Sequence, residues 1–272
     1  MRSFSVLISL YFKEHPSYLI QSLNSIFTQT LLPNEVVIVK DGTLTLELDK
    51  TVSEYEKRYS QIKVISLEKN QGLGKALNEG LKHCSFDLIA RMDTDDIAYP
   101  DRFEKQVKFM TEHPEIDACS SWIDEFIDST DNIVSTKKLP ETDEEIKRYA
   151  KLRSPLNHPA VMFRKQAVIN VGGYKHFYLF EDYYLWVRMI MNESKMYNLQ
   201  ESLLYFRYSP EMIKRRGGWK YAKSEINLQK EFYRIGFIGL GTFMKNIAIR
   251  LSVRMIPNEL RDFIYKKFLR KK

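Results

Sequence analysis

The chain has 272 residues, of which 44% are hydrophobic and 28% charged, a composition typical of a globular protein with a sizeable core. Cys84 and Cys119 stand apart without CxxC spacing, which excludes a zinc-type cluster and favours a reduced, cytosolic compartment. No run reaches the roughly 18 apolar residues that a transmembrane helix requires. Residues 4–12 are interpreted as a first strand and not as a signal peptide.

The net charge of +7 belongs to the C-terminal segment. Residues 242–272 hold nine Lys/Arg and two acids, whereas residues 1–241 hold 33 of each kind. A neutral body argues against a nucleic-acid groove. A basic end favours contact with an anionic surface, which we expect to be the cytoplasmic face of the inner membrane.

The first part of the chain alternates predicted strands with predicted helices. Such an alternation predicts βαβ units and a mostly parallel sheet with helices on both faces. Ligands of these sheets bind beyond the carboxyl ends of the strands, where Asp41 and the acidic run 93–96 are expected. The predicted strands are 4–10, 35–40, 62–67 and 86–92, and the predicted helices are 16–29, 46–59 and 75–83.

The second part is less regular. Its pattern predicts two antiparallel strands, 118–126 and 133–136, and a loop that leads into a strand over 154–164. The tail 242–272 predicts two imperfectly amphipathic helices, the second after Pro257. Further helices are predicted over 100–113, 141–151 and 181–192.

Asp93-Thr-Asp95 is the sharpest chemical signal. Side chains two apart on an extended chain point the same way, so these carboxylates can share one hard cation, Mn²⁺ or Mg²⁺. The alternative is a solvated acidic turn that caps the next helix. Delivery of the acids by a buried strand favours the metal site, because their mutual repulsion needs a cation to relieve it.

Other residues around the predicted strand ends suit a phosphate or a sugar. The segment Asn70-Gln-Gly72-Leu-Gly-Lys75 lacks the Walker spacing, but a glycine turn that opens a helix still offers N–H groups to an anion. Arg91 lies within an apolar strand and needs an anionic partner.

A third group of candidates follows in the second half. Glu181-Asp182 begins a predicted helix that is rich in aromatic residues, among them Trp186. The two acids are either a plain acidic helix start or a carboxylate base beside rings that stack on a sugar. His158 is a ligand or a satisfied loop histidine. A solvated basic loop or a diphosphate site explains the remaining candidates, Arg207, Arg215 and Arg216.

These motifs, in this order, resemble the family 2 glycosyltransferases with the GT-A fold, over about residues 4–210. The resemblance is to bacterial enzymes of O-antigen, capsule and exopolysaccharide assembly, of the amylovoran-galactosyltransferase type. It implies a Rossmann-like α/β sheet with a C-terminal helical extension. The motifs are Lys40-Asp-Gly42, Asn70-Gln-Gly-Leu-Gly-Lys-Ala-Leu-Asn78, Ala90-Arg-Met-Asp-Thr-Asp-Asp96, Asn157-His-Pro159 and Glu181-Asp-Tyr-Tyr-Leu-Trp186.

The resemblance also implies residue roles. Asp41 would bind uracil, Asp93 the ribose and sugar, and Asp95 the metal on the diphosphate. Asp182, beside Glu181, would be the catalytic base. We expect Asn70, Gly72, Lys75 and Arg91 to complete the nucleotide-sugar site, and His158, Trp186, Arg207, Arg215 and Arg216 to face the acceptor or a diphosphate.

The expected reaction is an inverting transfer of one hexose, galactose or glucose, from a UDP-sugar to a GlcNAc-type acceptor on a polyprenyl diphosphate. The processive QxxRW signature is absent, which favours a single β-linked addition. Residues 1–96 would bind the nucleotide-sugar, 97–210 the acceptor, and 211–272 the membrane surface. Rival hypotheses are a sugar nucleotidyltransferase, which would release pyrophosphate, and a non-catalytic membrane-docked module, which would not need Asp182.

Overall fold

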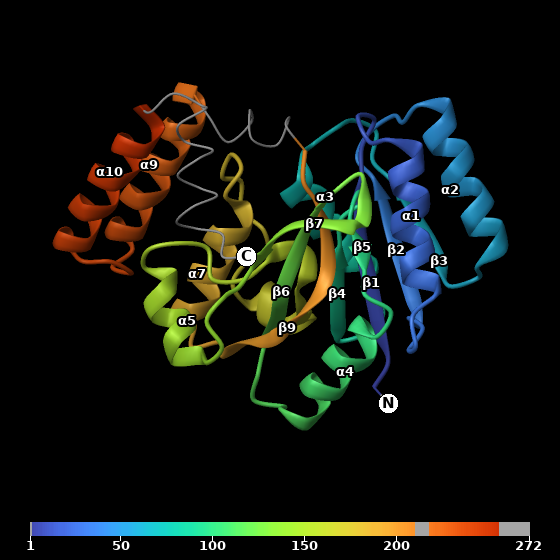
Figure 1. The fold of residues 1–272 in the computed structure, drawn as a ribbon, viewed down its shortest axis with the longest axis horizontal. Helices are drawn as coiled ribbons and strands as arrows, with labels where there is room; N and C mark the ends of the chain where they lie inside the picture. The colour runs from blue at the N-terminus through green and yellow to red at the C-terminus, as the bar shows by residue number, and fades with distance from the viewer. Residues whose placement is uncertain (1, 210–217, 256–272) are drawn as a thin grey trace.

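The computed structural model describes residues 2–209 and 218–255 (Figure 1). Within them, one nine-stranded sheet has the strand order β3-β2-β1-β4-β8-β6-β9-β5, with β7 paired to β6. Helices flank this sheet, and a further helical pair, α9 and α10, lies at one side beside α7 (Figure 1). The expected α/β class with a C-terminal helical extension is confirmed.

The first four strands are parallel to one another, as predicted. The apolar runs of β1, β2 and β4 are buried along nearly their whole length, which is typical of strands covered on both faces, whereas the edge strand β3 is only partly buried. The strands are β1 (Phe4–Leu10), β2 (Glu35–Lys40), β3 (Ile62–Ser66) and β4 (Leu88–Met92), and the helices between them are α1 (Pro16–Phe27), α2 (Leu46–Arg58) and α3 (Leu73–His83).

The rest of the sheet is mixed. β8 is antiparallel to β4 and to β6, β5 is antiparallel to β9, and only the pairing of β6 with β9 is parallel among the described strands beyond β4. The expectation of a mostly parallel sheet therefore holds only for the first four strands. These elements are β5 (Ile97–Ala98), α4 (Arg102–Glu112), β6 (Ala118–Ile127), β7 (Ser129–Lys137), α5 (Asp143–Ala150), η1 (His158–Ala160), β8 (Met162–Arg164), α6 (Lys165–Asn170), α7 (Glu181–Met191) and β9 (Met196–Arg207).

Two hydrophobic clusters form the core, one on each face of the sheet. On one face α1, α2 and α4 pack on alternate residues of β1, such as Val6 and Ile8. On the other face α3, α6 and α7 pack on the intervening residues, such as Leu7. Both clusters contain residues from before and after residue 96, so the two parts of the chain share one core.

A third cluster joins the helical extension to the body. It lies between α7 and α9 (Gly218–Arg234), and it continues to α10 (Leu240–Met255) through Phe243. Polar contacts add to it: Asn246 Nδ2 donates to the carbonyl of Lys151 at 2.9 Å, and Arg250 Nη2 donates to that of Leu152 at 2.7 Å. The described part of the extension is therefore packed on the helix that begins with Glu181.

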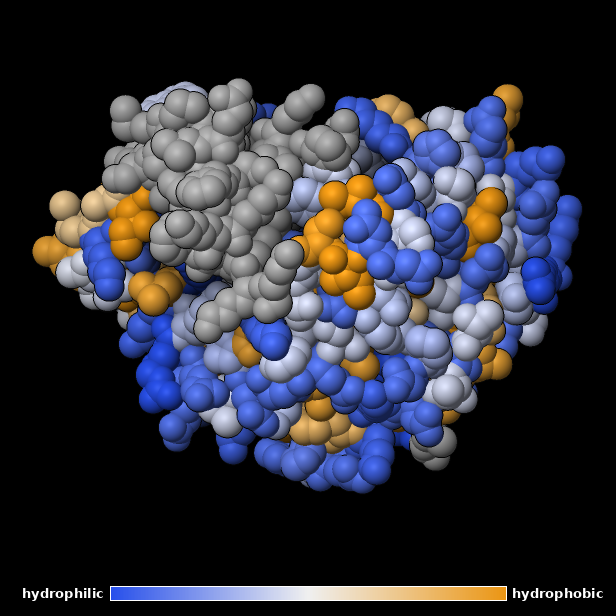
Figure 2. Space-filling view, viewed as in Figure 1, coloured by the Kyte–Doolittle hydropathy of each residue, from blue (hydrophilic) through white to orange (hydrophobic). Residues whose placement is uncertain are grey.

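The surface seen in Figure 2 is mainly hydrophilic, and a gathering of hydrophobic side chains lies over β7. Ile133 and Val134 of this strand are both exposed. Among the helices of residues 2–209 and 218–255, none combines the length and the apolar character that a bilayer span needs. The expected second tail helix, after Pro257, lies outside the described residues.

Candidate active site

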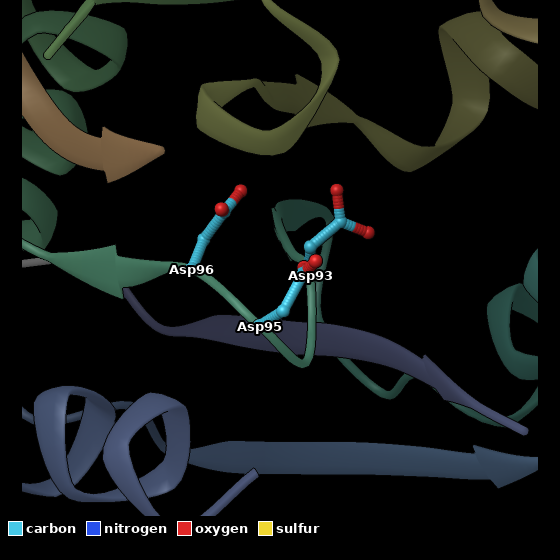
Figure 3. Close-up of side chains that lie close together, drawn as sticks. All are labelled: Asp93, Asp95 and Asp96. Atoms are coloured by element: carbon cyan, nitrogen blue, oxygen red, sulfur yellow. The ribbon is translucent and has the colours of Figure 1, made fainter. Parts of the chain in front are cut away.

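Three carboxylates gather on the loop that joins β4 to β5. Ligand oxygens of Asp93, Asp95 and Asp96 all lie within 4.8 Å of one another, and the side chains rise on the same side of the loop (Figure 3). Burial, followed by the nearby Asp93 and Glu14, raises the pKa of Asp95 to about 7. Burial and Asp95 raise the pKa of Asp96 well above its usual range. Such crowded acidic oxygens favour protons or a hard cation.

The end of β9 fixes this loop. Arg207 donates from its main-chain N–H to Asp96 Oδ1 at 2.9 Å and from Nε to the carbonyl of Asp95, also at 2.9 Å. Its guanidinium further contacts Gln21 and lies 4.0 Å from the ring of Tyr18 and 4.6 Å from that of Phe126. The Arg207 guanidinium is thus largely buried in contacts within the protein, and its predicted role toward the acceptor or a diphosphate stays a prediction.

The loop after β1 supports the acidic loop from another side. The Thr94 hydroxyl donates to Glu14, and the Ser22 hydroxyl donates to the carbonyl of Asp93 at 2.8 Å. Glu14 is also one of the charges that raise the pKa of Asp95. The sequence interpretation missed Glu14, although its place just after a buried strand, at the expected ligand edge, was a usable signal.

Arg91 lies at the centre of the site and is 2% exposed. Its Nη2 pairs with Asp93, while Nε and Nη1 have no hydrogen-bond partner among the described residues. Burial alone would lower the pKa of Arg91, but the charge of Asp93 offsets this and raises it, so the guanidinium remains positive. The expected anionic partner of Arg91 is thus Asp93, and two donors remain for a ligand.

The Asp41 side chain holds the glycine turn between β3 and α3 through hydrogen bonds. Its Oδ1 accepts from the N–H of Gln71 at 2.7 Å, and its Oδ2 accepts from that of Gly72 at 2.9 Å. A Cβ on Gly42 would lie 2.6 Å from the main-chain nitrogen of Asn70. The turn after β2 can therefore approach the turn at Asn70 only because residue 42 is glycine. Asp41 therefore organises the turn, and its predicted contact with uracil stays a prediction. Lys75, exposed in the first turn of α3, is free to reach a ligand at this edge.

Helix α3 also contacts the start of α7. A Cβ on Gly74 would lie 3.3 Å from Cβ of Tyr174 and 3.6 Å from Cβ of Glu181. Asn78 holds the approach to α7, because its side chain donates to the carbonyl and accepts from the N–H of Tyr174, both at 2.7 Å. The first turn of α3 and Glu181 are thus side by side.

Glu181 and Asp182 occupy the first turn of α7. Burial, and then the charge of Asp182, raises the pKa of Glu181 to about 7, with Arg91 opposing the rise. Arg91 therefore interacts with Asp93 on the acidic loop and with Glu181 on α7. The two predicted carboxylate groups, far apart in sequence, thus lie near the same guanidinium.

His158 and Trp186 are buried beside this site. His158 Nε2 lies 2.9 Å from the Tyr174 hydroxyl, and burial and Arg91 lower the pKa of His158 well below its usual value, so it is neutral. Trp186 is 0% exposed and packs edge-on against His158. The prediction that Trp186 stacks on an acceptor is wrong, because it is a core residue.

Two predicted residues, Arg215 and Arg216, lie outside the described residues. The sequence interpretation missed Tyr174 and gave no role to Asn78, the last residue of the glycine motif, although the two residues join α3 to the segment before α7. Gly172 and Gly173, both at positive φ, were a signal for a tight turn before α7.

Comparisons with known proteins agree with this geometry. The sequence model of Glycosyl transferase family 2 matches residues 5–172. The chain is 44% identical over 268 residues to an Escherichia coli UDP-Gal:alpha-D-GlcNAc-diphosphoundecaprenol beta-1,3-galactosyltransferase, covering 98% of this chain and 97% of that protein. It is 40% identical over 267 residues to the amylovoran biosynthesis glycosyltransferase AmsE of Erwinia amylovora, covering 97% and 98%.

Solved structures share the fold. S. aureus TarS 1–349 in complex with UDP-GlcNAc superposes with a TM-score of 0.66 at 19% identity, covering 97% of this chain and 81% of that one. The mannosyltransferase PcManGT of Pyrobaculum calidifontis, in complex with GDP-Man and Mn²⁺, gives 0.65 at 15% identity, covering 96% and 72%. The match over more than half of the chain and the identity over nearly all of it lead to one conclusion: the chain belongs to glycosyl transferase family 2.

Proposed function

We propose that this glycosyltransferase moves one hexose, with galactose the first to test, from a UDP-sugar onto a GlcNAc residue carried by a lipid diphosphate. The support for these substrates is the 44% identity, over nearly the full length, with the E. coli galactosyltransferase. The product would be a β-linkage in the assembly of a bacterial surface polysaccharide, in line with the likeness to AmsE.

The single observation that carries the proposal is the position of Arg91. It is buried between the acidic loop and α7, it is charged, and two of its donor nitrogens lack partners in the described residues. A buried donor without a partner is costly, and oxygen-rich ligands satisfy it. A nucleotide-sugar held between Asp93 and Glu181 would supply such oxygens.

The acidic loop fits a divalent cation. Its donors are carboxylate oxygens, the type that Mn²⁺ and Mg²⁺ take, and Asp96 Oδ2 is buried without a partner in the described structure. Asp95 would hold the ion, with Asp93 beside it. The ion would supply positive charge to a departing nucleoside diphosphate.

The residues of the chain would then act in a fixed arrangement. Asp182 would accept the proton of the acceptor hydroxyl, as that oxygen bonds to the anomeric carbon and the bond from this carbon to the diphosphate breaks. A single displacement inverts the configuration, so an α-linked donor gives a β-linked product. The pKa of Glu181, raised to about 7 by burial and by Asp182, allows it to carry a proton beside the proposed base.

We further propose that the basic C-terminal end holds the enzyme at the inner face of the cell membrane, where a lipid-linked acceptor resides. Residues 242–272 hold nine Lys/Arg against two acids. Leu240, Met244 and Ile249 of α10 are exposed, each about half or more. Basic and apolar side chains together suit an anionic lipid interface.

The test is a donor screen on a GlcNAc diphospholipid with product detection by mass. Transfer of one hexose with release of UDP is the expected result, and galactose is the expected donor. Release of pyrophosphate would instead indicate a nucleotidyltransferase. Absence of turnover with every UDP-hexose, in the presence of Mn²⁺ or Mg²⁺, would overturn the proposal.

A further inference from the structure

A strip of basic and apolar side chains borders the start of α7. We name it the α7 lip, and it consists of Tyr178, Leu179, Trp219, Lys220 and Lys223. The first two belong to the loop just before Glu181, and the other three to the first turns of α9. Tyr178 is 37% exposed, Leu179 38% and Trp219 74%, and both lysines are exposed.

Specific contacts hold the two parts of the α7 lip together. The Ser224 hydroxyl donates to the carbonyl of Tyr178 at 2.7 Å, and Lys220 Nζ lies 4.2 Å from the centre of the Tyr178 ring. Phe180 and Tyr221 pack beneath, with ring centres 5.0 Å apart. The α7 lip is thus fixed relative to Glu181 and Asp182.

The backbone and the charge of the α7 lip both suit an anionic, partly apolar ligand. Leu179 has φ +62°, a left-handed conformation that is costly for a leucine and is found at ligand-binding loops. Neither residues 172–180 nor residues 218–224 contain an acid. The next acid on α9, Glu225, is buried and pairs with Arg250 at 3.1 Å. The charge of Lys220 and Lys223 therefore faces no opposing carboxylate within these segments.

We infer that the α7 lip binds the diphosphate and the first isoprenoid units of the lipid-linked acceptor. This inference rests on the proposed function. The reacting hydroxyl of the acceptor GlcNAc must reach Asp182. The diphosphate is attached to the same sugar, one ring width from that hydroxyl. It would therefore lie near the residues that flank the start of α7. Lys220 and Lys223 match its charge. The exposed Trp219, Tyr178 and Leu179 offer apolar surface to the chain that follows.

The test compares two acceptors with the full-length protein in detergent, where no membrane is present. One acceptor is GlcNAc on a polyprenyl diphosphate, and the other is methyl GlcNAc, which lacks both diphosphate and lipid. Lys220→Glu and Trp219→Ala should each raise the KM for the first acceptor about tenfold, the usual effect of losing one charge-assisted or well-buried contact. The KM for the UDP-sugar and the rate with methyl GlcNAc should stay unchanged.

Lys230→Glu is the matched control, because Lys230 is exposed on the same helix outside the α7 lip. It should leave every constant unchanged. The inference is overturned if the wild type transfers to both acceptors and the variants keep the wild-type KM for the lipid diphosphate. The proposed function would stand in that case. Equal losses with both acceptors also overturn the inference, since they indicate a general defect. A wild-type enzyme without any transfer overturns the proposed function, and this inference with it.

Discussion

Arg207 Nε donates to the main-chain carbonyl of Asp95 at 2.9 Å, although 112 residues separate the two in the chain. The same residue donates from its N–H to Asp96, so the end of β9 sets both the backbone and a side chain of the acidic loop. Arg207 is therefore a positioning residue for the proposed metal site. Its effect on a bound ion would be exerted through the position of Asp95 and Asp96.

The first prediction concerns this link. Arg207→Lys removes the planar donor, so the Mn²⁺ concentration needed for half-maximal activity should rise by about tenfold or more, as is usual for residues that orient metal ligands. Activity is measured against Mn²⁺ concentration. Arg164→Lys is the control, because Arg164 also donates to main-chain carbonyls, those of Met110 and Ile116, on the far side of the core. If Arg207→Lys and Arg164→Lys need the same Mn²⁺ concentration for half-maximal activity, Arg207 stabilises the fold and does not position the metal ligands.

The second prediction concerns Asp95. Asp95→Asn should abolish turnover, and EDTA should do the same to the wild type until Mn²⁺ is restored. Because burial, Asp93 and Glu14 raise the pKa of Asp95 to about 7, its ionised form is strained without a cation. In EDTA at pH 8 the variant should thus melt at a higher temperature than the wild type. Full activity in excess EDTA would refute the metal site.

The third prediction separates the base from the donor site. Asp182→Asn should lower kcat by about 10²–10⁴-fold, the usual contribution of a general base, while the affinity for UDP-sugar stays close to that of the wild type. Binding is measured by calorimetry and turnover by UDP release. If donor affinity falls as far as kcat, Asp182 belongs to the donor site and the assigned role is wrong.

The sequence predicted well whatever depends on short-range pattern. The buried strands, with Asp41 and Asp93–Asp96 after them, follow from apolar runs and from acids at their ends, and Glu181-Asp182 follows from an acidic first turn before an aromatic helix. The strand β9 was missed, because its centre is the polar stretch Asn198–Ser202 and its partner is β6, about 80 residues earlier. The contacts of Arg207 and the burial of Trp186 likewise depend on packing between distant parts of the chain, which local pattern does not reveal.

The fourth prediction uses the pKa of Glu181, which is raised from 4.5 to about 7 by burial and Asp182. A raised folded-state pKa contributes stability below about pH 4.5 that is lost as the pH rises through 7. In EDTA, the free energy of unfolding of the wild type should therefore fall between pH 5 and pH 8 by up to about 3 kcal/mol more than that of Glu181→Gln. Urea unfolding at each pH provides the measurement.

Glu145→Gln is the control for this experiment. Hydrogen bonds from Thr142 lower the pKa of Glu145, the opposite direction to the shift of Glu181. This variant should keep the wild-type slope between pH 5 and pH 8. A Glu181→Gln slope equal to that of the wild type would mean that Glu181 is ionised throughout this range.

The last prediction concerns the basic end, and the packing of α10 decides where to cut. Asn246 and Arg250 bind the carbonyls of Lys151 and Leu152, and Phe243 packs on the third cluster. A protein that ends at Gly241 would lose these contacts and expose that cluster, so loss of membrane binding could not be separated from loss of fold. A protein that ends at Met255 keeps them all.

Removal of residues 256–272 takes away six of the nine basic residues of the C-terminal segment and both of its acids. Each base near an anionic leaflet contributes about 1 kcal/mol at most before screening, so the loss should be decisive at low salt. We expect the full-length protein to sediment with phosphatidylglycerol vesicles at low salt and to be released at high salt. The shortened protein should remain in the supernatant and still transfer to methyl GlcNAc. If both proteins sediment equally, residues 256–272 are not the anchor and the exposed face of α10 takes that role. The double variant Leu240→Ser/Met244→Ser should then fail to sediment.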